Sequence, residues 1–352
     1  MATINVTDLQ DAAKTYDPIL RTLPFFIFQD FAQKLRITVR EVKTGTEEKR
    51  TNLHRRAGGT FPYSASEQLP DPMPELLRTQ TEILKPELVA MELQDNVTNY
   101  LEKQPLVIAG TPFDPKTKQH PLKRQIVEGA VRSHAEDVVL TGSFFGQRDL
   151  SVKAPIGAFD GYYTKIAEAI ADGKIDSTTG GVNKNYETTG DLSGTVTVMQ
   201  FDALVDWVGN SHPMLRSSKD GIPVLWLSGS LLRIALNSYK VKTNSHTDPT
   251  LAQMINALRD SSFCPSLEIA THEGLGTGNK LTLIKSGNAE MGVDTISASN
   301  FVQVRAPFRD PNRVQFWIEA GYGVRFNDYN AKVFRTNEQT NTVLDLAGDY
   351  TA

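Results

Sequence analysis

The chain has 352 residues, enough for two to three domains of ordinary size and a substantial buried core. With 39% hydrophobic and 22% charged residues its composition is globular, which excludes collagen, a coiled coil and a wholly disordered chain. The 37 basic and 41 acidic residues give a net charge of −4, so no global positive field attracts nucleic acid or an anionic membrane.

The N-terminal region combines a possible helix cap at Thr7 with an apolar stretch over residues 23–28. Clustered aromatic side chains near a terminus need a surface to cover. Two surfaces remain open at this stage, the protein's own core and a neighbouring subunit. Phe25, Phe26 and Phe28 are the residues of this stretch that we consider for a subunit contact.

A period-two alternation over residues 35–39 then predicts a half-exposed strand. From 43 to 75 glycines and prolines recur without a sustained apolar period, and apolar residues return towards Val89. Loops longer than about 12–15 residues are uncommon in compact domains and are usually functional or disordered. The segment 40–56 predicts a mixed-sign solvated hairpin or an intersubunit salt-bridge surface, with phosphate contact as a further possibility. Its three acidic residues face six basic ones, Arg40, Lys43, Lys49, Arg50, Arg55 and Arg56.

The clearest helical pattern spans residues 121–141, with Pro121 in the first turn and Gly142 after the end. A helix of about twenty residues is a rod of roughly 30 Å, suited to act as a spine. His134 has no partner one turn away, which favours a packing histidine over a metal ligand. A second helix is predicted over 159–171.

A segment rich in Thr, Gly and Asn between residues 175 and 194 predicts a domain junction. Beyond it we expect helices at 201–208, 228–239 and 248–258, and a buried strand at 223–227. Further strands are expected at 267–271, 281–285, 301–305, 313–318 and 323–326. The predicted fold class is therefore α+β.

Patterns of known catalytic sites are missing from the sequence. The run 274–279 looks like a dinucleotide loop, but Asn279 stands where a glycine is needed and a strand follows where a helix is needed. The single cysteine, Cys264, cannot form an intrachain disulfide, and the N-terminus lacks a secretory signal, so we expect a soluble protein made in a cytosol. We predict no catalytic residue, no cofactor and no metal; an unrecognised metabolic enzyme stays open as an alternative.

Nearly the whole chain carries an ordered series of elements and short phrases that occur together in one family. The series includes the arm up to Gln33, the loop between the strands at 35–39 and 88–93, Leu122-Lys123-Arg124-Gln125-Ile126-Val127-Glu128-Gly129-Ala130 running into 137–142, Phe159-Asp160-Gly161, Asn300-Phe301-Val302-Gln303-Val304 and 315–324. In this order they resemble the major capsid proteins of tailed bacteriophages of the Hong Kong 97 type. The resemblance implies an N-terminal arm (1–33), an extended loop with its flanking strands (34–93), a peripheral domain (94–190) with the spine helix 121–141, an axial domain (191–299), and returning strands with a C-terminal tail (300–352).

The resemblance also implies a function without catalysis: self-assembly into hexamers and pentamers of an icosahedral shell around double-stranded DNA. The implied partners are a separate scaffolding protein, a portal, decoration proteins and weakly held DNA, with no membrane. The implied location is the virion capsid, assembled in the host bacterial cytoplasm. An encapsulin-like compartment shell is the alternative with the same fold. Subunit contacts are expected at Phe25, Phe26, Phe28, Arg40, Lys43, Lys49, Arg50, Arg55, Arg56, Phe61 and Tyr63.

Overall fold

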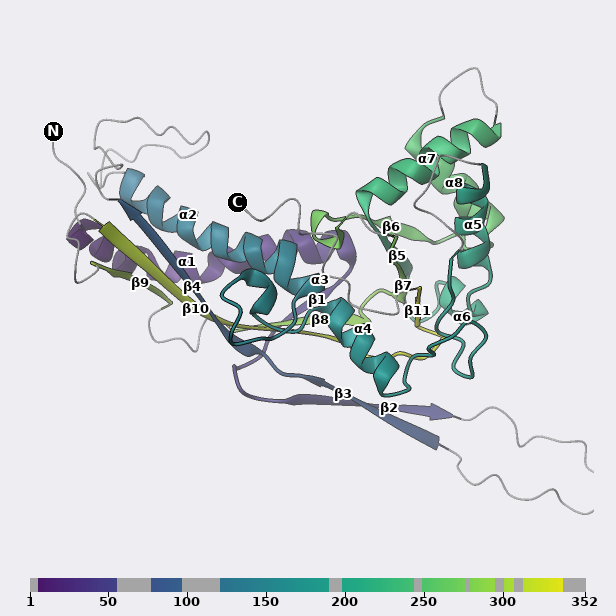
Figure 1. Ribbon diagram of the computed structural model, residues 1–352, viewed down its shortest axis with the longest axis horizontal. Coiled ribbons are helices and arrows are strands. Elements are labelled where there is room, and N and C mark those ends of the chain that lie inside the picture. The colour runs from purple at the N-terminus through teal and green to yellow at the C-terminus, as the bar shows by residue number, and fades with distance from the viewer. Residues whose placement is uncertain are drawn as a thin grey trace, which may run out of the picture.

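The chain folds around two β-sheets, and a β-hairpin projects from the first of them (Figure 1). The computed structural model describes residues 6–55, 77–96, 121–189, 198–243, 249–276, 279–294, 301–306 and 313–337. The first sheet has the strand order β1-β8-β10-β4, with β9 also paired to β10. Its strands are β1 (Thr38–Glu41), β4 (Glu87–Asn96), β8 (Ala289–Asp294), β9 (Val302–Arg305) and β10 (Arg313–Phe326).

Two long helices, α1 (Val6–Leu35) and α2 (Pro121–Asp137), cover one face of this sheet (Figure 1). Alternation along β10 explains the packing, because the even-numbered side chains from Val314 to Phe326 are buried. Among them, the ring of Tyr322 lies edge-on to Phe28 of α1 and beside His134 of α2. The opposite face of the sheet therefore carries the odd-numbered residues of β10.

The spine helix begins at Pro121 as predicted but does not end before Gly142. After Asp137 a π-helical turn (Val138–Gly142) continues the helix into α3 (Ser143–Phe145). A Cβ at Gly142 would lie 2.8 Å from the ring of Phe159. Glycine at this position serves close packing against the segment before α4 (Tyr162–Ala171) rather than termination of the helix.

The second sheet has the order β11-β7-β5-β6 and separates two hydrophobic cores. Its strands are β5 (Pro223–Leu227), β6 (Glu268–Ala270), β7 (Leu281–Lys285) and β11 (Phe334–Thr336). In β5, Val224 and Trp226 face the core shared with the first sheet, whereas Leu225 and Leu227 face a helical layer. That layer contains α5 (Val198–Gly209), α7 (Gly229–Thr243) and α8 (Leu251–Ser261), and the short α6 (Pro213–Arg216) lies nearby.

The possible cap at Thr7 and the apolar stretch over residues 23–28 both lie within one continuous helix. α1 is one helix of 30 residues with Pro18 and Pro24 inside it. Packing on α2 and the first sheet outweighs the backbone hydrogen bonds that the prolines remove. The strand expected from residue 35 begins at Thr38, because the helix continues to Leu35 and Arg36 adopts a left-handed φ of 56°.

The excursion expected as a loop over 43–75 contains a strand. β2 (Glu48–Arg55) pairs antiparallel with β3 (Leu77–Leu84), and residues 56–76 lie outside the described part of the chain. The strand β8 also differs from expectation. It lies within 191–299, the range expected for the axial domain, yet it completes the first sheet beside β1 and β10.

Candidate assembly surface

The β2–β3 hairpin lies against the face of the first sheet opposite to the helices and then projects beyond the sheet, towards the lower right of Figure 1. Alternation gives it two different faces. The inward face is buried at Glu82 and Leu84. The outward face exposes Leu53 by 64% and Ile83 by 44%. We call this outward face, formed by Lys49, Thr51, Leu53, Thr79, Thr81 and Ile83, the outer hairpin face.

Glycines let the base of the hairpin approach the sheet closely. A Cβ at Gly323 in β10 would lie 2.8 Å from the carbonyl oxygen of Lys85. A Cβ at Gly321 would overlap the hydroxyl of Thr44, and one at Gly292 in β8 would lie 3.1 Å from the ring of Pro86. Side chains at these three positions would push the hairpin off the sheet.

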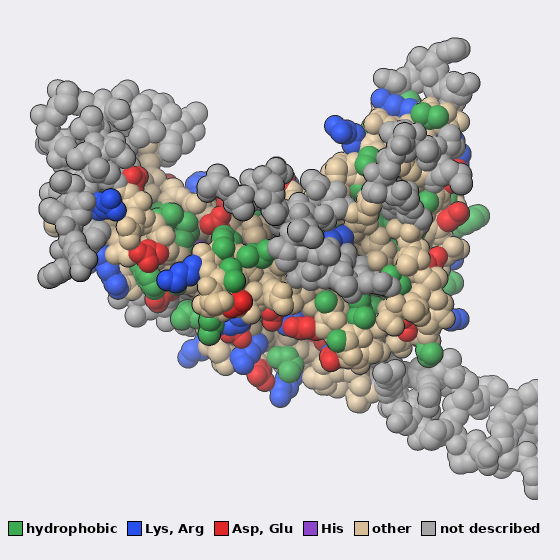
Figure 2. Space-filling model, in the orientation of Figure 1, with side chains coloured by type: hydrophobic (Ala, Val, Ile, Leu, Met, Phe, Trp, Pro, Cys, Tyr) green, Lys and Arg blue, Asp and Glu red, His purple; other side chains and the backbone are tan. Residues whose placement is uncertain are grey.

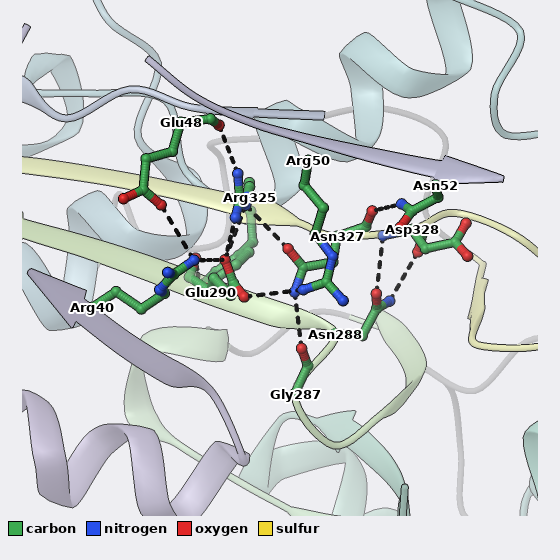
Figure 3. Close-up of polar contacts among 11 residues, drawn as sticks. Arg40, Glu48, Arg50, Asn52, Gly287, Asn288, Glu290, Arg325, Asn327 and Asp328 are labelled. Carbon is green, nitrogen blue, oxygen red and sulfur yellow. Dashed lines mark hydrogen bonds and ion pairs between the residues drawn. The ribbon is translucent and has the colours of Figure 1, made fainter. Parts of the chain in front are cut away.

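A buried carboxylate, Glu290 of β8, is the centre of the contacts that anchor the hairpin (Figure 3). Its Oε2 accepts two hydrogen bonds from Arg325 of β10, at 2.5 Å from Nη2 and 3.0 Å from Nε. Arg50 of β2 approaches it at 3.3 Å and Arg40 of β1 at 3.7 Å. Arg40 also pairs at 3.2 Å with Glu48 at the start of β2. Charges from three strands thus converge on one carboxylate.

Hydrogen bonds to the backbone complete this anchor. Nη1 of Arg325 donates to the carbonyl of Glu48 at 2.7 Å, and the amide of Asn52 donates to the carbonyl of Asn327. Burial alone would raise the pKa of Glu290, but hydrogen bonds from Asn327 and Arg325 and the charges of Arg325 and Arg40 outweigh it, so the pKa is lowered. Glu290 is therefore ionised at neutral pH.

Two further contacts hold the hairpin at other points. Nζ of Lys174, just beyond α4, lies 3.1 Å from the carboxylate of Glu82. The backbone N–H of Thr44 donates to Asp294 at 2.6 Å. Figure 2 shows charged side chains of both signs gathered on the lower side of the molecule, around the hairpin base. The hairpin is thus attached at its base, and its outer face is left to solvent.

The residues expected at subunit contacts separate into three groups. Arg40 and Arg50 belong to the anchor within the subunit, and Phe28 is buried in the subunit's own core. Phe26, Lys43 and Lys49 are exposed. The side chains of Phe25 and Arg55, and the whole of Arg56, Phe61 and Tyr63, lie outside the described residues. The side chain of Phe28 packs against Tyr322 on the inner side of α1, so it is not exposed to another subunit.

A second exposed surface lies on the same face of the first sheet, beyond the hairpin. We call it the bare patch. Its central residue, half-buried Trp317, donates from Nε1 to Glu319 at 2.5 Å. The patch extends towards the upper left of Figure 1, away from the direction of the hairpin. It consists of Leu88, Ala90, Glu92 and Gln94 of β4 and Gln315, Trp317 and Glu319 of β10.

In the described part of the chain, no group of three or more His, Cys, Asp or Glu side chains could hold a metal ion. The glycines at 274 and 276 form a turn in which Nδ1 of His272 accepts from the N–H of Gly274. Among the same residues, no helix is long and apolar enough to cross a membrane.

Comparisons with known proteins find similarity in structure alone. No family model matches the chain, and no curated protein matches its sequence. A chain of the procapsid of satellite phage P4, a particle that includes the size determination protein Sid, superposes with a TM-score of 0.52 at 11% identity, covering 93% of this chain and 90% of that chain. The protein has a phage capsid fold of the Hong Kong 97 type. The fold class expected from the order of elements is thereby confirmed.

Other capsids also match over most of their length. The capsid of the Myoviridae phage XM1 is 10% identical with a TM-score of 0.49, over 87% of this chain and 90% of that chain. The capsid of an empty GTA particle is 13% identical with a TM-score of 0.48, over 87% and 95%.

Two residues of the anchor, Glu290 and Arg325, were missed in the sequence. Glu290 and Arg325 are 35 positions apart, and Glu290 lies in a strand that the sequence pattern did not predict. The one available signal was Gly321-Tyr322-Gly323 inside a strand, because glycines in a strand often mark a close approach of another backbone.

Proposed function

We propose that this protein is the major capsid protein of a tailed phage, forming hexamers and pentamers of an icosahedral shell around double-stranded DNA. The observation that carries the proposal is a firmly anchored, projecting hairpin on a chain with a capsid fold. An isolated two-stranded hairpin is marginally stable in water. Exposed Leu53 and Ile83 on such a hairpin are explained by burial against another subunit.

The arrangement of the two exposed surfaces supports contacts between copies in one orientation. The hairpin leaves the sheet where Gly321, Gly323 and Arg325 lie, whereas the bare patch around Trp317 occupies the other half of β10. When two copies lie side by side in the same orientation, the hairpin of one copy can lie near the bare patch of the other. Such head-to-tail contacts use different surfaces on each side and close into rings when the rotation permits.

The domain assignment follows the two sheets. We assign the peripheral domain to the first sheet with α1 and the spine helix α2, and the axial domain to the second sheet with α5, α7 and α8. The expected partners are further copies of the chain, a separate scaffolding protein, a portal, decoration proteins and weakly held DNA. The expected location is the virion, assembled in the host cytoplasm, and the role is structural rather than enzymatic.

A phage shell is preferred to an encapsulin-like compartment shell. Of the three solved structures described above, the chain of the phage procapsid has the highest TM-score. The two functions differ in what the shell encloses, so nucleic acid in purified native particles supports the phage assignment and a protein cargo opposes it.

The test of the function is a charge placed on the outer hairpin face. Leu53→Glu combined with Ile83→Glu should leave a folded subunit, because both side chains are exposed, and should prevent shells from forming. Val182→Glu is the matched control, since Val182 is 95% exposed in a loop outside the hairpin. Electron microscopy and sedimentation report assembly, and circular dichroism reports folding. If the double variant forms normal shells, the outer hairpin face does not make the proposed contact between subunits.

A further inference from the structure

We propose that Glu290 is a positioning residue for assembly: its negative charge fixes the direction in which the β2–β3 hairpin leaves the first sheet. The inference rests on the proposed function, because the direction matters only if the hairpin meets a neighbouring copy. It assigns this role to one side chain, whereas the hairpin is also held by Lys174 and by the turn at Thr44.

The balance of charge makes Glu290 the residue on which the anchor depends. Three guanidinium groups, from Arg40, Arg50 and Arg325, surround it, and Glu48 is the other carboxylate in these contacts. With Glu290 ionised, the five groups have a net charge of +1. Without its charge, three guanidinium groups face one carboxylate and the net charge becomes +2. The contacts then change from attractive to mainly repulsive.

Exposure decides which groups move when that charge is lost. The side chains of Glu290 and Arg325 are 6% and 4% exposed, so Arg325 cannot turn into water without leaving the sheet. Those of Arg40 and Arg50 are 45% and 49% exposed. They can rehydrate by a short movement. Because Arg50 belongs to β2, its movement takes the hairpin away from the sheet.

The sheet itself has other support. Met291 and Val293, on the opposite side of β8, are fully buried against the helices, and β8 stays paired with β1 and β10. The hairpin has a natural pivot at its base, where Gly45 has a φ of 78° and its N–H donates to the carbonyl of Pro86 at 3.2 Å. Loss of the charge should therefore release the hairpin while the sheet remains folded.

The decisive variant is Glu290→Gln, which keeps the size and the acceptor oxygen but removes the charge. Hydrogen exchange measured on unassembled subunits should rise about tenfold in β2 and β3, as expected when hydrogen bonds to a charged group are lost. Exchange in β7 and in the buried half of β10 should stay within about twofold of the original protein. Assembly should yield no closed shells, or shells of altered diameter.

Lys174→Gln is the matched control, because it removes a different ion pair between the hairpin and the rest of the subunit and leaves Glu290 in place. It should change exchange in β2 and β3 less than Glu290→Gln does. If Glu290→Gln fails to fold, Arg50→Gln replaces it. That variant removes one half-exposed partner and should raise exchange in the same two strands.

Two results would overturn the proposal. One is unchanged exchange in β2 and β3 of Glu290→Gln or, where that variant does not fold, of Arg50→Gln. The other is an equal rise throughout the first sheet, which is what a merely structural ion pair gives. Failure of the unaltered protein to form shells would count against the proposed function instead, because the exchange measurement uses single subunits.

Discussion

His134 gives the subunit a dependence of stability on pH that can be calculated. Its side chain on α2 is 2% exposed, its ring lies 5.5 Å from that of Tyr322, and its Nε2 has no hydrogen-bond partner among the described residues. Burial lowers the pKa of His134 from 6.5 to about 4. A lowered folded pKa means that the unfolded chain binds the proton more readily. The contribution of neutral His134 to the free energy of unfolding is therefore fully present above pH 6.5 and is lost as the pH falls towards 4.

The size of the effect follows from the two pKa values. Between about pH 7.5 and pH 4.5, protonation of His134 in the unfolded chain should cost the folded subunit about 2.5 kcal/mol. The variant His134→Leu removes this titration and keeps a side chain of similar volume. Urea unfolding of unassembled subunits at both pH values gives the free energies, and the difference between the two proteins isolates the histidine from all carboxylates.

Tyr322→Phe is the control. It removes a buried hydroxyl that also lacks a partner among the described residues, but it changes no group that titrates in this range. Its dependence on pH should equal that of the original protein. If His134→Leu keeps the same pH dependence as the original protein, the assignment of a buried, neutral His134 is refuted.

Three further predictions concern the buried parts of the subunit. Arg335→Met breaks a buried ion pair and should lower the free energy of unfolding, measured in urea, by about 3 kcal/mol. This is the low end for such a loss, because the partner Glu187 stays partly in water. A loss below about 1 kcal/mol would contradict the prediction. Gly323→Ala places a Cβ 2.8 Å from a backbone oxygen and should lower the free energy of unfolding by about 1–3 kcal/mol. In the control Gly229→Ala the new Cβ meets nothing within 4 Å, so stability should not fall. Equal effects of the two variants in thermal unfolding would contradict the close approach at Gly323. Burial raises the pKa of Cys264 to about 11, so a maleimide should label it only as the protein unfolds, and rapid labelling of folded protein would show that the side chain is accessible.

The elements best predicted from sequence were those buried on both sides. β5 and β7 were expected at 223–227 and 281–285 and have those bounds, because β5 is a short continuous apolar run and β7 has three apolar residues among its five. β8 was missed because Glu290, Gly292 and Asp294 interrupt its apolar residues. These three residues face the hairpin, so their polarity and small size make sense only once the hairpin is in place.

Local patterns also underestimated two segments that depend on contacts distant in sequence. Only the possible cap at Thr7 indicated a helix near the N-terminus, yet α1 continues through Pro18 and Pro24 because its apolar face packs along α2. β2 was expected within a long loop whose first part could form a solvated hairpin, but its partner β3 was not predicted, because β3 begins 22 residues after β2 ends. The basic character of 40–56 was visible in the sequence. Its partner Glu290, 240 positions from Arg50, was not.

Electron microscopy of the purified protein, expressed alone and together with the proposed scaffolding protein, tests most directly whether this subunit builds a shell. Closed icosahedral particles or rings of five and six subunits are the expected result, with density for the hairpin lying over an adjacent copy. A uniform small oligomer in both preparations would contradict the assignment as a shell protein.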